Sequence, residues 1–262
     1  MIKTIEGEKS KFLPLFIKKK GDSKVKKIVA FVGSNNKASR TVAFTKKIVK
    51  KIQENYNGEI NFELYTLQNV DIEMCMGCSH CFIKGSCPLK DDVNQLFKKM
   101  KEADLIILGS PVYMHGVSGG TKNFIDRISW QAHLLSLAGK GAIAVSTCLS
   151  NGHLTAVSQL EKYLSDFGAT VIEKANSAIE YPDEFLNQEW MIEKCQDIAN
   201  KVIDFWNSED IKTSELVELK FKAYKKIMEY RYNAGDYSFE PMHWKNSRML
   251  EFNSLYEYLN YK

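Results

Sequence analysis

The first long apolar run of the chain reads Lys27-Ile28-Val29-Ala30-Phe31-Val32 and ends at Gly33-Ser34. A short, nearly continuous run of this kind is typical of a strand that is buried on both faces of a parallel sheet. From Thr41 onward, apolar residues recur at spacings of three and four, which predicts an amphipathic helix. The order of strand, loop and helix therefore predicts the opening of a βαβ unit.

The same alternation repeats along the chain. We expect further strands at residues 60–64, 105–108, 142–145 and 170–172, and further helices over 93–100, 121–130, 157–167 and 191–205. Five strands alternating with five helices predict an α/β, doubly wound parallel sheet with helices on both faces. Right-handed crossovers leave few strand orders, among them 2-1-3-4-5, and ligands of such sheets bind beyond the carboxyl ends of the strands.

Composition limits the class of protein. The chain has 262 residues, of which 44% are hydrophobic, and a formal net charge of only +4. This balance predicts no nucleic-acid binding, which usually needs a concentrated basic stripe, and no apolar run is long enough for a membrane span. A cytoplasmic location follows as an expectation. The cysteines agree with this location, because the four between Cys75 and Cys87 are too closely spaced for a disulfide framework and the cytosol would keep them reduced.

Three segments differ in composition. Residues 1–26 form a lysine-rich N-terminal extension, residues 27–207 carry the strand and helix alternation, and residues 208–262 are rich in aromatic residues. So many aromatic side chains need burial, so the last segment is not expected to be disordered. We expect a helical C-terminal extension that docks on its own domain or on a second subunit.

The loop after the first strand has the character of a phosphate site. It reads Gly33-Ser34-Asn35-Asn36-Lys37-Ala38-Ser39-Arg40-Thr41 and leads directly into a helix. Backbone N–H groups at a helix N-terminus favour anions, and hydroxyl groups suit a terminal phosphate monoester. The loop lacks the glycine spacing of dinucleotide folds and of P-loops. The predicted ligands are Ser34, Asn36, Ser39, Arg40 and Thr41; the alternative is that the hydroxyl groups only cap the helix.

A second loop carries a resemblance to a known family. The chain after the third strand reads Gly109-Ser110-Pro111-Val112-Tyr113-Met114-His115-Gly116-Val117-Ser118, and Lys122-Asn123-Phe124-Ile125-Asp126-Arg127 follows. Together with Gly33-Ser34, Ser39 and Thr41, these residues resemble the NADPH-dependent FMN reductase family of the flavodoxin-like superfamily, over about residues 26–205. The resemblance implies a flavodoxin-like fold in which the first loop holds the FMN phosphate. It further implies that the isoalloxazine edge is lined by Pro111, Val112, Tyr113, Met114, His115 and Gly116. We expect Lys122, Asp126 and Arg127 to pair structurally along their helix.

Four cysteines form a compact motif. The run from Cys75 to Pro88 reads C-x2-C-x2-C-x5-C-P, and two-residue gaps let a loop wrap three thiolates around one face of an iron–sulfur cubane. Zinc, which also accepts four thiolates, and a loop that holds no metal remain as alternatives. Within the family, the motif resembles that of the iron–sulfur flavoproteins. This resemblance implies a [4Fe–4S] cluster held by Cys75, Cys78, Cys81 and Cys87.

The sequence thus predicts an NAD(P)H-dependent FMN oxidoreductase that passes electrons to a [4Fe–4S] cluster or to a quinone-like small-molecule acceptor. FMN would be the cofactor and NAD(P)H the co-substrate, with no general acid or base assigned. Two alternatives stay open: an electron carrier reduced by a partner protein, and a redox-sensing flavin-binding protein. We expect a homodimer or homotetramer, because a flavin edge needs shelter.

Overall fold

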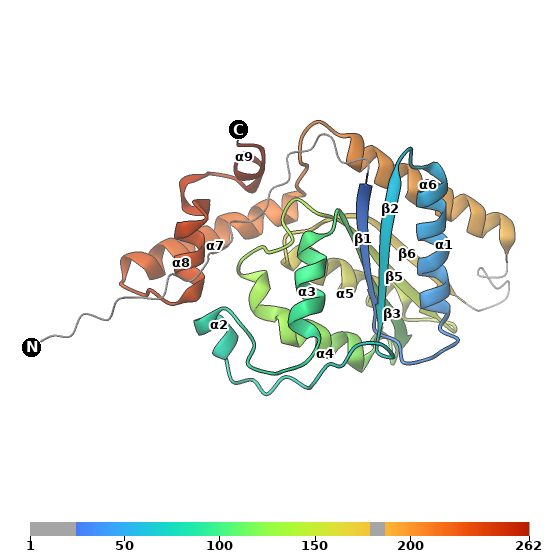
Figure 1. Cartoon of the computed structure of the whole chain (residues 1–262), viewed down its shortest axis with the longest axis horizontal. Coiled ribbons are helices and arrows are strands. Elements are labelled where there is room, and N and C mark those ends of the chain that lie inside the picture. The colour runs from blue at the N-terminus through green and yellow to red at the C-terminus, as the bar shows by residue number, and fades with distance from the viewer. Residues whose placement is uncertain (1–24, 179–186, 262) are drawn as a thin grey trace, which may run out of the picture.

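The computed structural model describes residues 25–178 and 187–261. Its central sheet is parallel, with the order β2-β1-β3-β5-β6, and lies between layers of helices (Figure 1). The strands are β1 (Val25–Val32), β2 (Glu59–Thr66), β3 (Leu105–Tyr113), β5 (Gly141–Cys148) and β6 (Thr170–Ala178). This order is the predicted 2-1-3-4-5 arrangement, which is confirmed. A two-residue strand, β4 (Gly116–Val117), pairs antiparallel with the end of β3 and was not predicted.

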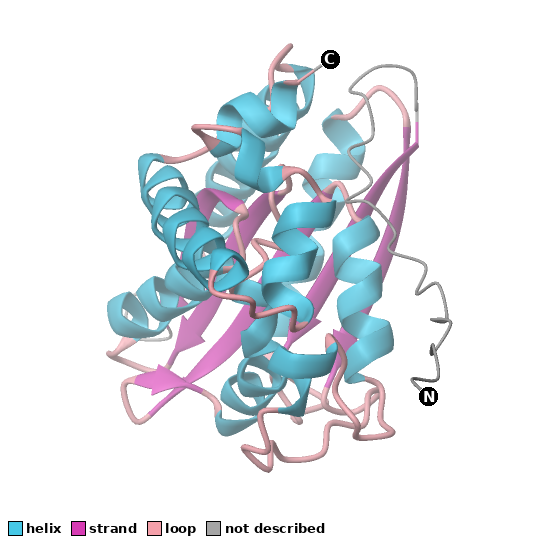
Figure 2. Cartoon of the chain, turned by 90° about the vertical axis from the view of Figure 1, so that its left-hand side faces the viewer, coloured by secondary structure: helices cyan, strands magenta, loops and turns pink. Residues whose placement is uncertain are grey.

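Helices cover both faces of the sheet because side chains alternate along each strand. In β1, Val29 and Phe31 join one core, while Ile28 and Ala30 join the other. The first core is covered by α3 (Val93–Glu102), α4 (Gly119–Ile128) and α5 (His153–Asp166). The second is covered by α1 (Arg40–Asn55) and α6 (Gln188–Asn207). Figure 2 shows the strands passing behind the helices of the near layer.

Two helices that begin at the carboxyl edge of the sheet, α1 and α4, have a serine as N-cap. The Ser39 side chain accepts a hydrogen bond from Val42 N at 3.3 Å, so α1 starts at Arg40. The Ser118 side chain accepts from Thr121 N at 3.1 Å, so α4 starts directly after the second loop. Serine is a favoured N-cap because its hydroxyl satisfies a backbone N–H that the helix leaves unpaired. Ser39 therefore caps α1.

The C-terminal segment builds a third core. It contains α7 (Glu215–Asn233), α8 (Phe239–Asn246), η2 (Met249–Glu251) and α9 (Leu255–Asn260), which lie beside the sheet domain in Figure 1. Phe221 and Trp244 of this segment are fully buried against residues that follow α4, among them Trp130 of η1 (Ser129–Ala132). Phe221 and Trp244 thus pack on the preceding part of the same chain, whereas Tyr230, Tyr237 and Tyr261 are exposed. Residues 1–24 of the predicted N-terminal extension lie outside the described residues.

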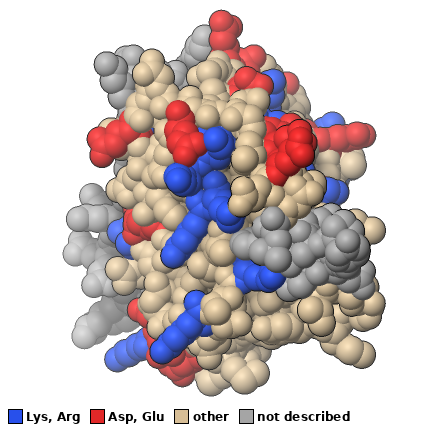
Figure 3. Space-filling view, turned by 90° about the vertical axis from the view of Figure 1, so that its right-hand side faces the viewer, with Lys and Arg blue, Asp and Glu red and all other residues tan. Residues whose placement is uncertain are grey.

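The face that α1 and α6 present carries both signs of charge. Figure 3 shows basic side chains along the middle of this face with acidic side chains around them. Ion pairs account for part of the mixture: Lys201 contacts both Glu173 and Asp197. Within residues 25–178 and 187–261, no helix combines the length and the hydropathy that crossing a membrane would demand.

Candidate functional site

The predicted phosphate loop lies between the end of β1 and the start of α1. Asn36 N donates to Ser34 Oγ at 3.3 Å, and Ala38 N donates to Asn36 Oδ1 at 2.9 Å, so the loop is braced by its own polar side chains. Ser34 and Ser39 are buried, whereas residues 35–38 are exposed. The loop therefore presents its middle residues to solvent at the N-terminus of a helix, where an anion is favoured.

Thr41 has a different environment from the rest of the loop. Its side chain is fully buried, and its hydroxyl lies 2.7 Å from the hydroxyl of Thr147 at the end of β5. Thr45 Oγ1, one turn further along α1, donates to the Thr41 carbonyl oxygen at 2.9 Å. Thr41 thus joins α1 to β5 beneath the loop, and its predicted contact with a phosphate stays a prediction.

The first and second loops are joined by short contacts. Gly33 N donates to Gly109 O at 2.9 Å, and Ser118 Oγ donates to the Gly33 carbonyl oxygen. Ser118 N donates to Ser110 Oγ at 2.8 Å. Because Ser118 also caps α4, one serine fixes the end of β1, the end of β3 and the start of a helix.

Helix N-termini give this edge its electrostatic character. Arg40, Gly119 and His153 begin α1, α4 and α5, which follow β1, the β3–β4 hairpin and β5 at the same carboxyl edge of the sheet. None of the three helices has an acidic residue in its first turn. The positive ends of the helix dipoles are therefore not neutralised by carboxylates, which favours a negatively charged ligand.

The segment predicted as a second loop forms a β-hairpin between the end of β3 and β4. β3 extends through Pro111 to Tyr113, and Tyr113 pairs with Gly116 across a turn formed by Met114 and His115. Both turn residues have positive φ, 47° and 61°, which side-chain-bearing residues rarely adopt. Backbone strain of this kind occurs at functional sites. The side chains of Tyr113 and Met114 are exposed, at 58% and 96%, at the tip of this hairpin.

A third segment lies against the hairpin. A Cβ atom at Gly152, which follows β5, would lie 2.8 Å from His115 Cα, so the two segments are in direct contact. Leu149 and Leu154, on either side of Gly152, are exposed apolar residues like Tyr113 and Met114. Exposed apolar side chains that gather at one edge mark a ligand or protein contact surface. This edge fits the apolar wall that a flavin needs.

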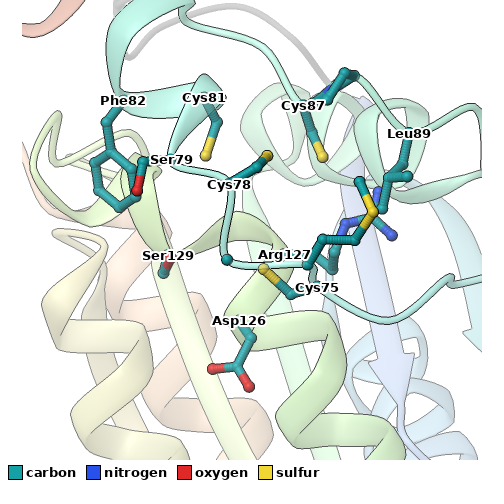
Figure 4. Close-up of a pocket in the computed structure, with 13 residues that line it drawn as sticks. Cys75, Cys78, Ser79, Cys81, Phe82, Cys87, Leu89, Asp126, Arg127 and Ser129 are labelled. Atoms are coloured by element: carbon teal, nitrogen blue, oxygen red, sulfur yellow. The ribbon is translucent and has the colours of Figure 1, made fainter.

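The four motif cysteines line one cavity of about 340 Å³. Figure 4 shows the sulfur atoms of Cys75, Cys78, Cys81 and Cys87 around this space. Cys81 belongs to α2 (His80–Lys84), a short helix in the cysteine loop that was not predicted. Burial raises the pKa of the Cys81 thiol, and the nearby Cys87 and Cys75 raise it further. The cysteine side chains are therefore close enough to interact electrostatically.

The cysteine cavity has room for a group larger than a single metal ion. No three His, Cys, Asp or Glu side chains among the described residues are arranged to hold one metal ion. A volume of about 340 Å³ corresponds to roughly ten water molecules. The thiol chemistry and this volume fit an iron–sulfur cluster, whose iron atoms all accept thiolates.

Helix α4 holds the entry to the cysteine loop. Asn123 Oδ1 accepts from Cys75 N at 3.3 Å, and Asn123 Nδ2 donates to the Ile72 carbonyl oxygen at 3.2 Å. One turn later, Arg127 Nη1 donates to the Glu73 carbonyl oxygen at 2.6 Å. Residues 123 and 127 lie on the same helix face. Asn123 and Arg127 thus both hold the segment that leads into Cys75.

Asp91 completes this arrangement. Arg127 forms a bidentate ion pair with Asp91, in which Nη2 lies 2.9 Å from Oδ1, and both side chains are fully buried. Asp91 also accepts from Glu73 N at 2.8 Å and from Val93 N at 3.2 Å. Burial alone would raise the pKa of Asp91, but these hydrogen bonds outweigh it and hold that pKa below its usual range. The cysteine loop is therefore fastened at its start and after its end.

The pairing predicted along α4 is confirmed for one pair only. Lys122 and Asp126 form an exposed i,i+4 ion pair, whereas Arg127 turns inward to Asp91. The roles of Asn123 and Asp91 were not predicted. Two signals in the sequence could have identified them. Asn123 and Arg127 lie four residues apart on an otherwise apolar helix face, and Asp91 follows soon after the last motif cysteine, Cys87.

The family model described as NADPH-dependent FMN reductase matches residues 26–183. An iron-sulfur flavoprotein of Methanocaldococcus jannaschii is 30% identical over 188 residues, which cover 68% of this chain and 96% of the relative. An iron-sulfur flavoprotein of Archaeoglobus fulgidus is 26% identical over 79% of this chain and 96% of the relative. Among solved structures, RosB with a bound 8-demethyl-8-formylriboflavin-5′-phosphate superposes with a TM-score of 0.55 at 12% identity, covering 81% of this chain and 89% of that chain. The latter likeness concerns the fold.

Proposed function

The chain belongs to the NADPH-dependent FMN reductase family, and on this premise we propose that it binds FMN and a [4Fe–4S] cluster at opposite ends of helix α4. Membership makes it an NAD(P)H-dependent flavin oxidoreductase. The observation that carries the proposal is the position of α4. Its N-cap Ser118 is bonded to both loops of the sheet edge, and near the end of the helix Arg127 lines the cysteine cavity.

The phosphate of FMN would be held at the start of α1. The exposed residues 35–38 and the hydroxyl groups of Ser34 and Ser39 lie where the helix dipole favours an anion. We assign Asn36, Arg40 and Thr41 to the same group of phosphate-binding residues. A bound phosphate would lie over an N-terminus that carries no acidic residue in its first turn.

The isoalloxazine ring would lie along the β3–β4 hairpin. Tyr113 and Met114 offer exposed apolar surface, and the backbone of residues 111–116 supplies donors and acceptors for the ring edge. We include Pro111, Val112, His115 and Gly116 in this site. When bound, FMN supplies hydride acceptance from NAD(P)H and electron release singly or in pairs. The protein's part is to orient the ring and to set its potential.

Cys75, Cys78, Cys81 and Cys87 would hold the cluster. When bound, a [4Fe–4S] cluster supplies one-electron transfer at a potential that depends on hydrogen bonds and exposure. Asn123 and Arg127 orient the loop from one side, and α8 packs on α2 from the other. The proposal extends to the electron acceptor, which would be a quinone-like small molecule or a partner protein.

We also propose a homodimer or homotetramer. The apolar side chains of Tyr113, Met114, Leu149 and Leu154 are exposed beside the proposed ring site. A second subunit that covered them would shelter the flavin and leave the phosphate loop of its partner open. Sedimentation analysis with and without FMN tests this directly: a monomer under both conditions contradicts the proposal.

Anaerobic purification of the whole chain, with flavin, iron and acid-labile sulfide measured per chain, tests the proposed cofactors. We expect one FMN, four iron and four sulfide, in accordance with the composition of a [4Fe–4S] cluster. A protein with FMN but without iron or sulfide refutes the cluster and leaves the flavin site standing. A protein without a flavin band after FMN addition refutes the whole proposal.

Stopped-flow mixing with NADPH and with NADH tests the reductase activity separately. Bleaching of the flavin band after mixing supports direct reduction by the nicotinamide. No bleaching with either nucleotide, in a protein that binds FMN, favours an electron carrier that a partner protein reduces. A Cys78→Ser variant is the matched comparison, since it removes one proposed cluster ligand from an exposed position and leaves the sheet edge unchanged.

A further inference from the structure

Helix α7 is apolar on two faces. Val217, Phe221 and Met228 are buried in the third core. A second row of apolar residues runs along another face, and we call it the α7 stripe: Leu216, Leu219, Ala223, Ile227 and Tyr230. All five residues are exposed, and the four larger ones are exposed to between 47% and 75%. A surface helix normally has one apolar face, so the second indicates a contact surface.

The shape of the α7 stripe fits another helix. Its residues recur at spacings of three and four, so they lie within about 80° of the helix circumference and extend over about 21 Å. A helix that lies in a lipid surface has a broad apolar face with an excess of basic residues beside it. One flank of the α7 stripe instead carries two exposed residues of each sign, Lys222, Lys226, Glu215 and Glu229. On the other flank, Lys220 and Arg231 form ion pairs within the chain. A narrow stripe with balanced charges therefore favours a helix over a membrane.

The α7 stripe is symmetric about Ala223. Counted from Ala223, its other members lie four and seven residues away in both directions along the helix. When a second α7 runs antiparallel with Ala223 against its own copy, Leu216 faces the partner's Tyr230 and Leu219 faces the partner's Ile227. The small central side chain lets the two helices approach closely, and the larger side chains pack on either side of it. Such a surface is self-complementary, as a two-fold interface between identical subunits requires.

We propose that two copies of this chain pair through the α7 stripe, with their α7 helices antiparallel and a two-fold axis at Ala223. The paired stripes bury on the order of 1,000 Å², which is about the smallest area of a specific protein–protein interface. Figure 1 shows α7 on the opposite side of the molecule from α1 and α6. The stripe shares no residue with the exposed apolar surface beside the proposed ring site, so this pairing does not depend on FMN.

Charge substitutions in the whole chain test the pairing and its direction. Leu219→Lys and Ile227→Glu each place a charge in the apolar contact. Each should raise the dissociation constant of the α7 contact at least about tenfold and halve the mass measured by sedimentation equilibrium. In the antiparallel alignment the introduced lysine faces the introduced glutamate of the partner, so the double variant should associate more tightly than either single variant. Within one helix the two positions are eight residues apart, which is too far for them to pair.

Ile192→Lys is the matched control. Ile192 of α6 is as exposed as Leu219, 59% against 58%, and lies outside the extension, so this variant should keep the wild-type mass. Ala223→Cys gives a second measurement. It should form an interchain disulfide on oxidation more readily than Lys222→Cys, because only the central position meets its own copy. The wild type oxidised in parallel gives the background from the exposed motif cysteines. FMN per chain and thermal unfolding verify that each variant is folded.

Three results overturn the proposal. The first is a monomeric wild type; if that monomer sediments with vesicles of anionic phospholipid, the stripe contacts a lipid surface instead. The second is an unchanged mass in Leu219→Lys, which places any oligomer contact elsewhere, for example at the ring site. The third is a double variant that associates no more tightly than the single ones, or equal disulfide yields at positions 222 and 223, either of which refutes the antiparallel alignment.

Discussion

Gly33→Ala is expected to destabilise the protein and to weaken FMN binding. A Cβ atom at Gly33 would lie 2.7 Å from Thr121 N and 2.8 Å from Thr121 Cα, and it would also collide with the Thr121 hydroxyl. Contacts below 3.0 Å with backbone atoms force the start of α4 away from the end of β1. Overpacking of this kind costs about 1 to 3 kcal/mol. For a chain of this size, the melting temperature falls by about 2 to 4 °C for each kcal/mol.

The assay combines urea unfolding of the apoprotein with FMN titration by flavin fluorescence. Because Gly33 joins the phosphate loop to Ser118, we expect the dissociation constant of FMN to rise about tenfold, or about 1.4 kcal/mol. Gly119→Ala is the control: nothing lies within 4 Å of its Cβ, and alanine favours a helix by up to about 1 kcal/mol. A Gly33→Ala protein within roughly 0.5 kcal/mol of wild type, with unchanged FMN affinity, refutes the reasoning.

Three further predictions concern other contacts. Gly85→Ala lowers the iron content and the stability, because Gly85 has φ +72° and its Cβ would lie 2.6 Å from Phe239 Cγ; iron per chain and thermal unfolding measure this. Thr41→Val lowers the free energy of unfolding by about 1 to 3 kcal/mol in urea, because the buried hydroxyl of Thr147 loses its partner. Burial, and to a lesser extent a neighbouring lysine, lowers the pKa of His243 to about 4. The free energy of unfolding should therefore fall by up to about 3 kcal/mol as the pH drops from about 6.5 to 4. Urea unfolding at a series of pH values measures this decline.

The predictions for Gly85 and His243 each have a control. Gly77 has φ +66° but nothing within 4 Å of its Cβ, so Gly77→Ala isolates backbone strain from the collision at Gly85. Equal losses in both variants contradict the role of the collision. For the acid effect, the unfolded state binds the proton first, since the folded pKa of His243 lies below the unfolded one. His243→Phe should remove the decline, and a decline that persists in this variant assigns it to other groups.

The sheet and its order were predictable because periodic burial leaves a strong local pattern. Apolar runs such as Ile28 to Val32 specify a strand buried on both faces, and the alternation with helices leaves few topologies. The β3–β4 hairpin was not predictable in the same way. Its turn residues, Met114 and His115, are not the asparagine and glycine that normally signal a tight hairpin. Pairing with β3 overrides the local preference.

The gathering of the four motif cysteines around one cavity was predictable from the sequence, but the residues that support the cysteine loop were not. The spacing of Cys75 to Cys87 identifies a group of thiols from local sequence alone. Asn123 and Asp91, by contrast, reach the loop through tertiary contacts between residues 18 to 48 positions apart. Arg127 looked like a member of an exposed helix pair, and only the packing of α4 against α3 buries it with Asp91. Long-range polar contacts leave no periodic pattern.

The position of α4 makes the two proposed sites mechanically dependent. Ten helical residues span about 15 Å, so a displacement at Ser118 is carried to Arg127 by a rigid element. The Gly33→Ala collision pushes on the start of α4, whereas the Gly85 collision acts on the cysteine loop from α8. FMN affinity and iron content should therefore fall together in Gly33→Ala, while iron alone should fall in Gly85→Ala. Loss of FMN without any loss of iron in Gly33→Ala would show that the two ends of α4 respond independently.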